Sequence, residues 1–370
     1  MKKLLVVTDN QAPRIDGIVR FLLEILPSLK KNFDVTILAP DFGHNALSIK
    51  QIKIPLSKIT IGDFPIAKPK LSTIRKAVKS SDILFLQTIS MIGFLAIKYA
   101  RLYKKPIIVY KHALEWELVP SAVNKPFLSK FLNFLVKFSV KGIYNNCDLI
   151  ITPSKSIAEK LSWYGIKTKK EIIPVGVDSN VFIPAKNKAI AKESIGLNPK
   201  KLVIGFHGRL TYEKGIKVLV RVYRQLLRKY KNLQLILLGD GLDEVRDFSL
   251  RKGVIVISGR QKVVPYLQAM DIYCMPSLTE TSCLSLIEAM SCGLPVVSTK
   301  AGLIPDYLTH DKNGLLTNKK DTYSLYKSLK LLIDDAERRN VFSKAARKTV
   351  INFFDWKVTS EKIIAVLKRF

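Results

Sequence analysis

Two glutamates, Glu280 and Glu288, stand eight residues apart around the start of an apolar segment, LSLIEAM, at residues 284–290. This segment has no helix breaker and predicts a helix, whereas the polar PSLTETS before it predicts a loop after the apolar DIYCM. A helix that follows a strand presents its unpaired N–H groups at the carboxyl edge of an open sheet, where ligands bind. A helix terminus suits a phosphate, and an ionised carboxylate can accept from two vicinal hydroxyls. The spacing therefore indicates a site for a phosphate group and a hydroxyl-rich group such as a sugar.

The same residues have a purely structural interpretation. Ser285 and Glu288 fit the S-x-x-E pattern of a helix capping box, and Glu280 fits a solvated acid in a loop. This segment alone leaves both interpretations open.

A second segment, LVIGFHGRLTYEKGI at residues 202–216, favours the ligand interpretation. An apolar run ends at Gly208, and Arg209 and Lys214 occupy the loop before the helical pattern IKVLVRVYRQLL. Glycine lets the backbone approach a ligand closely, and the two cations are placed to neutralise a pyrophosphate. His207 is interpreted only as part of the wall of this loop.

With these two segments the chain resembles the retaining nucleotide-sugar glycosyltransferases of the GT-B fold, specifically the mannosyltransferase-like branch of the GT4 group. GRLTYEKGI is similar to the family's G-R-x-x-x-x-K-G loop, and ETSCLSLIEAMSCGLPVVST is similar to its E-x7-E block. Further similar segments are IIPVGVDSNVFIP at 172–184, LLGDG at 237–241 and the glycine loop PRIDGIVRF at 13–21. The resemblance spans nearly the whole chain.

The resemblance implies a role for each residue of the site. Arg209 and Lys214 would bind the donor diphosphate and stabilise its charge as the bond breaks. Glu288 would bind the ribose, and Glu280 the hydroxyls of the transferred sugar. Further donor contacts are implied at Gly17, Gly208, Cys283 and Leu284.

Three positions depart from the family pattern. Cys283 and Leu303 stand where the family usually has glycine, and Asp16 replaces the first glycine of a pair that Gly17 completes. Cys283 adds a side chain beside the pocket, so the preference for the sugar stays open. Asp16 is assigned to the acceptor side of the site.

Short apolar runs alternate with helical stretches in both halves, which predicts an α/β fold with buried parallel strands. The predicted strands are 2–10, 34–40, 82–88, 105–112, 147–154, 202–206, 233–239, 253–259, 271–277 and 294–299. The resemblance implies two Rossmann-like domains that face a central cleft. We expect an acceptor domain at 1–178, completed by a C-terminal helix at 353–370 that crosses back to it, and a donor domain at 179–352.

The 370 residues include 61 Lys and Arg against 30 Asp and Glu, a net charge of +31 that is spread over both halves. The chain has no recognised nucleic-acid module, so we expect no nucleic-acid partner and favour an anionic membrane surface. In the segment 126–144, Lys130, Lys137 and Lys141 share one face of a helical pattern that is rich in Phe and Leu. A core helix with a solvated lysine stripe explains that segment equally well, and the charge excess also suits solubility.

The sequence also bears on location. MKKLLVVTDN predicts a first strand rather than a signal peptide, and no run reaches the roughly 18 apolar residues that span a bilayer. The four cysteines lack metal or redox spacing. We therefore expect a cytoplasmic enzyme that associates peripherally with the inner face of the membrane.

His112 follows the apolar strand PIIVY and is the histidine placed to meet substrate, where a neutral imidazole can hydrogen-bond a sugar hydroxyl. The alternative is a histidine packed against Trp116. No D-x-D motif stands out, so we expect neither a metal nor another cofactor.

The expected reaction moves a hexose, from GDP-mannose first and UDP-glucose next, to a lipid-linked or glycan acceptor, with domain closure that excludes water. A nucleotide-sugar epimerase of the same fold and a non-catalytic nucleotide-sugar-binding protein are the alternatives.

Overall fold

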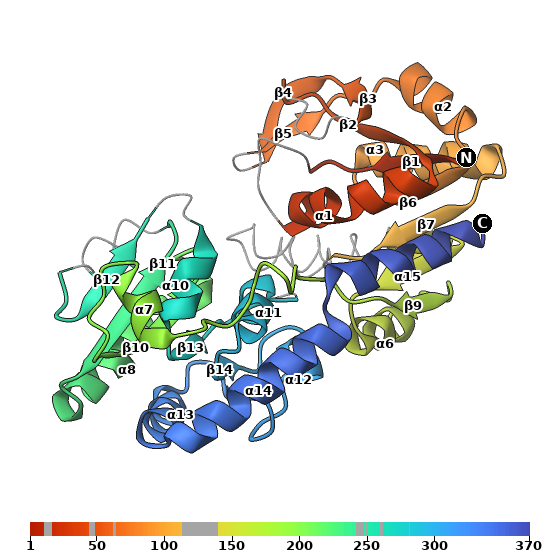
Figure 1. The fold of residues 1–370 in the computed structure, drawn as a ribbon. Coiled ribbons are helices and arrows are strands. Elements are labelled where there is room, and N and C mark those ends of the chain that lie inside the picture. The colour runs from red at the N-terminus through yellow and green to blue at the C-terminus, as the bar shows by residue number, and fades with distance from the viewer. Residues whose placement is uncertain are drawn as a thin grey trace. The chain divides into compact units, whose positions relative to one another are not determined.

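The computed structural model describes residues 1–10, 17–43, 49–61, 64–112, 140–241, 248, 250–258, 262–280 and 282–370. The chain forms two compact units (Figure 1). Unit 1 comprises Met1–Pro174 and Lys357–Phe370, and unit 2 comprises Val175–Trp356.

Unit 1 is built on a parallel sheet with the strand order β3-β2-β1-β6-β7-β8-β9. Its strands are β1 (Lys3–Val7), β2 (Asp34–Pro40), β3 (Lys50–Ile54), β6 (Ile83–Leu86), β7 (Ile107–Tyr110), β8 (Leu149–Thr152) and β9 (Lys170–Ile172). A separate antiparallel pair consists of β4 (Leu56–Ile61) and β5 (Phe64–Ala67). Every residue of the central strands β6, β7 and β8 is buried, as expected where helices cover both faces of a parallel sheet.

The helices of unit 1 are α1 (Gly17–Asn32), α2 (Leu71–Lys79), α3 (Met91–Leu102), α6 (Lys155–Trp163) and α15 (Trp356–Lys368), of which α15 starts on the last residue of unit 2. Ser90 caps α3 by accepting from the backbone N–H groups of Ile92 and Gly93, which have no partner within the helix. The last helix is joined to the unit by a hydrogen bond of 3.1 Å from the Thr359 hydroxyl to the carbonyl oxygen of Pro174.

Unit 2 has a six-stranded parallel sheet with the order β12-β11-β10-β13-β14-β15. Its strands are β10 (Leu202–His207), β11 (Leu233–Leu238), β12 (Val254–Ile257), β13 (Ile272–Met275), β14 (Val296–Thr299) and β15 (Leu315–Thr317). Its helices are α7 (Lys188–Glu193), α8 (Ile216–Lys229), α10 (Val263–Ala269), α11 (Leu284–Ser291), α12 (Ile304–Tyr307), α13 (Thr322–Asp334) and α14 (Ala336–Phe353), with a 3-10 turn at Tyr212–Lys214.

The strand order of unit 2 reverses between β10 and β13. Successive strands are added toward β12 on one side of β10, and toward β15 on the other side. Helices that follow two such strands lie on opposite faces of the sheet, which leaves a crevice outside the carboxyl ends of those strands. The loop of Gly208 follows β10, and the loop of Glu280 follows β13. The topology therefore brings the two segments singled out in the sequence to one crevice.

An ion pair between a buried lysine and a half-buried aspartate joins the opposite ends of the same two strands. Lys192 of α7 is 5% exposed, and its Nζ lies 2.7 Å from a carboxylate oxygen of Asp271, just before β13. The same carboxylate accepts from the N–H of Val203 in β10 at 2.7 Å. These bonds fix β10 against β13 at the edge of the sheet away from the crevice.

All ten predicted strand segments contain a strand, which confirms the α/β expectation. The sequence did not predict β3, β4, β5, β9 or β15, which are short or lie at a sheet edge. All four cysteines are buried thiols outside any disulfide. None of the helices in the described part of the chain is long and apolar enough to cross a membrane.

Candidate active site

The loops after β10 and β13 touch through their backbones. The N–H of Leu278 donates to the carbonyl oxygen of Glu213 at 2.7 Å. Gly215 has a φ of +69°, and a Cβ there would lie 2.2 Å from the carbonyl oxygen of Pro276. Only glycine combines this left-handed conformation with so close an approach, so Gly215 lets the loop that carries Lys214 reach the loop that carries Glu280.

Lys214 and Glu280 are joined in the crevice. The Nζ of Lys214 donates to Oε1 of Glu280 at 2.7 Å, and the hydroxyl of Ser277 donates to the same oxygen at 2.7 Å. The side chain of Lys214 is 16% exposed, and that of Glu280 is 6% exposed. A carboxylate so far from solvent depends on such partners, and these two donors hold Glu280 at the carboxyl end of β13.

Glu288 lies within α11 and is 2% exposed. Its Oε2 is 2.7 Å from Nε2 of His207, the last residue of β10. The backbone oxygen of His207 accepts from the hydroxyl of Tyr273 in β13 at 3.2 Å. Glu288 is therefore connected to both strands that flank the reversal of the sheet.

Helix α11 begins at Leu284, and Cys283 is its N-cap residue. Cys283 has φ 54° and ψ 64°, a left-handed conformation that costs a residue other than glycine about 1 kcal/mol. No side chain caps the helix, so the capping box of Ser285 and Glu288 is wrong. The first N–H groups of the helix have no acceptor within it, and a terminus of this kind suits an anion. Burial raises the pKa of the Cys283 thiol, so Cys283 is a neutral thiol rather than a nucleophile.

The backbone of Gly208 lies close against the backbone of Gly239. Its φ is +139°, and a Cβ on Gly239, in the loop after β11, would lie 1.9 Å from the carbonyl oxygen of Gly208. A Cβ on Gly208 itself would lie 4.0 Å from the hydroxyl oxygen of Ser285 in α11, so the two loops and the start of this helix lie close together.

Arg209 differs from Lys214 in its surroundings. Its side chain is 75% exposed and contacts Glu213 at 3.3 Å, the weak type of surface pair. Arg209 is thus a solvated cation beside the crevice, whereas Lys214 is a fixed one.

Unit 1 carries polar side chains at the carboxyl ends of its central strands. Nε2 of His112, after β7, lies 2.9 Å from Oε1 of Gln87, after β6. Its ring packs at 4.8 Å from Phe21 and 4.7 Å from Tyr110, measured between centroids. Burial and the charge of the neighbouring Lys111 lower the pKa of His112 to about 3, so the imidazole is neutral.

A second polar pair lies at the same edge. The hydroxyl of Thr88 donates to Oδ2 of Asp9 at 2.7 Å, and the N–H of Asp9 donates back to that hydroxyl at 3.0 Å. Burial raises the pKa of Asp9 above its ordinary value. Asp9, Thr88 and Gln87 were missed in the sequence, although each lies within two residues of the end of an apolar strand.

The remaining predicted residues are placed as follows. Gly17 is the first residue of α1, and a Cβ there would meet no atom within 4 Å. Lys141 is exposed, with its Nζ beside Gly165. Asp16, Trp116, Lys130 and Lys137 lie outside the described residues.

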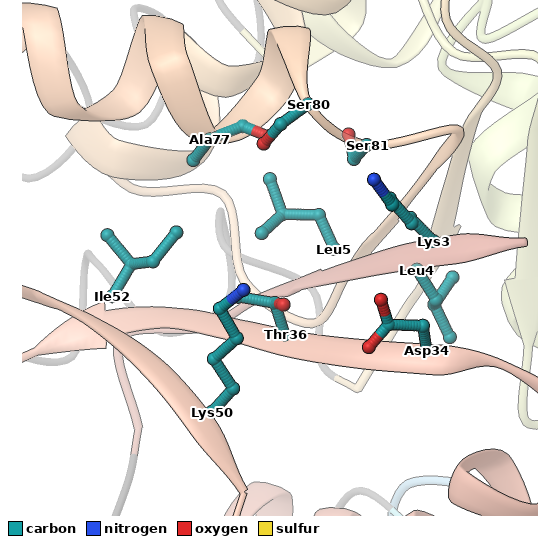
Figure 2. A pocket seen from close by; sticks show the side chains of 10 residues that line it. All are labelled: Lys3, Leu4, Leu5, Asp34, Thr36, Lys50, Ile52, Ala77, Ser80 and Ser81. Atoms are coloured by element: carbon teal, nitrogen blue, oxygen red, sulfur yellow. The ribbon is translucent and has the colours of Figure 1, made fainter.

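A cavity of about 140 Å³ lies elsewhere in unit 1 (Figure 2). Lys3, Asp34 and Lys50, the first residues of β1, β2 and β3, line it together with Ser80 and Ser81. It therefore opens at the amino ends of the strands, the edge opposite to the one where open α/β sheets bind ligands.

The sequence did not predict the bond of His207 to Glu288. The available signal was a polar side chain that ends an apolar strand directly before Gly208. In the part of the chain that the structure describes, no three His, Cys, Asp or Glu side chains gather as metal ligands.

Two family models match most of the chain. The model for glycosyl transferases group 1 matches residues 187–349, and that for glycosyltransferase family 4 matches residues 15–181. A GDP-mannose-dependent alpha-mannosyltransferase of Corynebacterium glutamicum is 25% identical over 360 residues, which cover 93% of this chain and 83% of the relative.

A second relative from the same organism is a GDP-mannose-dependent monoacylated alpha-(1-6)-phosphatidylinositol monomannoside mannosyltransferase. It is 24% identical, with 99% of this chain and 98% of the relative covered. Among solved structures, HepE of Anabaena in complex with UDP superposes with a TM-score of 0.80 at 19% identity, and both chains are covered completely. This similarity shows the GT-B fold.

Proposed function

Because the chain belongs to the GT4 group of glycosyltransferases and is a hexosyltransferase, we propose that it moves a hexose from a nucleotide sugar to a lipid-linked or glycan acceptor. GDP-mannose is the preferred donor in this proposal, and UDP-glucose is the next. The GDP-mannose dependence named for the two corynebacterial relatives supports the first, and a HepE structure in complex with UDP-glucose supports the second.

The observation that carries the proposal is the arrangement around α11. One buried carboxylate lies on each side of the helix terminus: Glu280 in the loop before it and Glu288 within it. The N–H groups between them suit the donor diphosphate. Glu280 then accepts from hydroxyls of the transferred sugar, and Glu288 from those of the ribose. Gly208, Cys283 and Leu284 supply backbone contacts in the same crevice.

Charge that grows on the departing diphosphate is stabilised by fixed groups of the chain. Lys214 is held in place by Glu280, and Arg209 is free to turn toward the phosphate from the rim. With the α11 terminus, these groups act where the charge develops. We propose that they replace a divalent cation and that the reaction requires no cofactor.

We propose further that unit 1 binds the acceptor. The neutral imidazole of His112, together with Gly17 and Asp16, is assigned to substrate contacts on this unit. The net charge of +31 supports attachment to an anionic, cytoplasmic membrane face, since each basic residue near such a surface contributes about 1 kcal/mol. The products are a nucleoside diphosphate and a glycoside with the anomeric configuration retained.

The test is a panel of nucleotide sugars incubated with the protein and a membrane lipid extract, with nucleotide release and glycolipid formation both measured. Equal amounts of the two products from one donor support hexosyl transfer to lipid. Conversion of the donor to its epimer without release would instead indicate an epimerase, and binding without turnover would indicate a binding protein. Glu280→Gln serves as the matched inactive control, because it preserves the size of the side chain.

A further inference from the structure

His207 and Glu288 form a buried pair in which only the glutamate has a role in the reaction proposed above. The two side chains are 7% and 3% exposed, and Nε2 lies 2.7 Å from Oε2. An ionised carboxylate in such surroundings is unfavourable by several kcal/mol unless it is hydrogen-bonded. Because an ionised carboxylate only accepts, Nε2 of His207 carries the proton in this bond.

The histidine is the more rigidly held member of the pair. It ends β10 between β11 and β13, and its carbonyl oxygen accepts from the hydroxyl of Tyr273. Its ring also meets the ring of Tyr273 at 5.4 Å between centroids, in an edge-on arrangement of 61°. Glu288 has a longer side chain with three rotatable bonds. The position of Nε2 therefore fixes the orientation of the carboxylate, rather than the reverse.

The second ring nitrogen of His207, Nδ1, indicates which polar contact the histidine makes. Within the described residues, Nδ1 of His207 is buried without a hydrogen-bond partner. Buried polar atoms are normally paired, so a histidine retained only for packing is expected to satisfy both nitrogens. The polar function of this ring lies in its bond to Glu288.

The bond to His207 uses only part of the acceptor capacity of a carboxylate. Two carboxylate oxygens provide about four acceptor positions, of which His207 takes one. Two vicinal hydroxyls need two more, and both hydroxyls are reached only if the plane of the carboxylate faces them.

We propose that His207 is a positioning residue that holds Glu288 in the orientation that accepts from both ribose hydroxyls, so that the site selects ribonucleotides over 2′-deoxyribonucleotides. This inference rests on the proposed function, in which Glu288 binds the ribose of the donor. The inference adds His207 to the site, and it adds a preference for ribonucleotides over 2′-deoxyribonucleotides.

The test is calorimetric titration of the full chain with GDP, UDP and the 2′-deoxy form of whichever binds more tightly. We expect the wild type to prefer the ribonucleotide by about tenfold or more, the usual effect of a hydrogen bond to a charged group. His207→Phe keeps an aromatic ring without the donor and should lose about tenfold in ribonucleotide affinity but little in 2′-deoxyribonucleotide affinity. His207→Gln keeps a donor at similar reach and should restore most of the preference.

The matched control is Tyr223→Phe. It removes buried hydrogen bonds to the carbonyl oxygens of Leu233 and Gly253, far along the chain from Glu288, and should leave the preference unchanged. Equal loss of both affinities in His207→Phe, with the preference kept, would mean a structural role and would overturn the inference alone. A wild type that binds neither nucleotide would overturn the proposed function as well.

A second measurement follows the imidazole of the wild type itself. In nitrogen-15 spectra of the wild type, the imidazole signal of His207, identified by its absence in His207→Gln, should move more on addition of the ribonucleotide than of its 2′-deoxy form. Equal movement with both, or no movement, would contradict the proposed coupling.

Discussion

Lys214 binds Glu280 directly, with 2.7 Å between Nζ and Oε1. The two residues were assigned in the sequence to different parts of the donor, the diphosphate and the transferred sugar. In the structure they are partners in a pair that is largely removed from solvent. In the reaction proposed above, the cation that neutralises the donor diphosphate is thus also the counterion of the carboxylate that accepts from the sugar, so a change of Lys214 acts on both contacts.

Lys214→Ala and Arg209→Ala should both lower turnover by about 100-fold to 1000-fold, the usual effect of losing one donor to a transition state. Their effects on stability should differ. Lys214→Ala leaves Glu280 buried without its cation and should lower the free energy of unfolding by about 3 kcal/mol. Arg209 is a surface cation, and its replacement should change stability by less than about 0.5 kcal/mol. Urea unfolding and steady-state kinetics of both variants measure this contrast.

For this pair of variants, near-wild-type turnover of either one would remove that residue from the mechanism. Equal stability of the two variants would mean that the Lys214 pair contributes no more than a surface contact.

Glu280→Gln and Glu288→Gln should differ in nucleotide binding. The nucleoside diphosphate product has a ribose but no transferred sugar. Glu280→Gln should therefore impair transfer and leave product affinity almost unchanged. Glu288→Gln should weaken product binding as well, by about 1.5 to 3 kcal/mol for a hydrogen bond to a charged group. Calorimetric titration of both variants with nucleoside diphosphate measures this, and unchanged product binding in Glu288→Gln would separate Glu288 from the ribose.

His112 should make the stability of the protein depend on pH. The pKa of His112 is lowered to about 3 in the folded protein, against an ordinary value of 6.5. Between these values the unfolded chain binds a proton that the folded protein does not, so stability is lost as pH falls below 6.5. Each pH unit corresponds to about 1.4 kcal/mol, which gives about 2 kcal/mol at pH 5.

His112→Gln removes this titration and keeps a polar group toward Gln87. From pH 7 to pH 5 the variant should lose about 2 kcal/mol less stability than the wild type, as measured by urea unfolding at both pH values. Parallel losses in the two proteins would show that His112 is protonated in the folded state or solvated there.

The excess of Lys and Arg over Asp and Glu should bind the protein to anionic vesicles in a salt-dependent way, because added salt screens the attraction. Replacement of Lys130, Lys137 and Lys141 together by Gln should reduce sedimentation with such vesicles at low salt. The control replaces three exposed lysines of unit 2, Lys312, Lys319 and Lys344, and should reduce it less. Equal binding to neutral vesicles, or equal effects of the two triple variants, would assign the 126–144 segment to the core of unit 1.

The fold could be predicted as far as its strands are continuous apolar runs. ILFL in β6 and IIVY in β7 are buried on both faces, and the sequence shows this directly. KQIKI in β3 lies at the edge of the sheet, where one side is open to solvent, and its lysines hide the strand pattern. β15 has only three residues, and so does β9 at the other edge of unit 1. The sheet centres are therefore encoded in local hydrophobicity, whereas the edges depend on a neighbour.

The location of the site could be predicted from the sequence, but the side-chain pairs within it could not. Gly208 and Glu280 follow apolar strands, and the strand order then brings their loops together. The bond of Lys214 to Glu280 spans 66 residues of sequence, and that of His207 to Glu288 spans 81. Such bonds depend on how two loops meet and leave no local pattern. The unusual backbone of Cys283 is hidden for the same reason, since a left-handed cysteine is held by its surroundings rather than by its own preference.

The ion pair of Lys192 and Asp271 gives the two ends of β10 and β13 different roles: the amino ends hold the strands together, and the carboxyl ends carry the loops of the proposed site. The ion pair and the bond from Val203 to Asp271 hold the two strands at their amino ends. They oppose sliding of one strand against the other at the end away from the proposed site. A change at Asp271 would therefore alter the alignment of β10 and β13, although Asp271 lies at the end of these strands away from the proposed site.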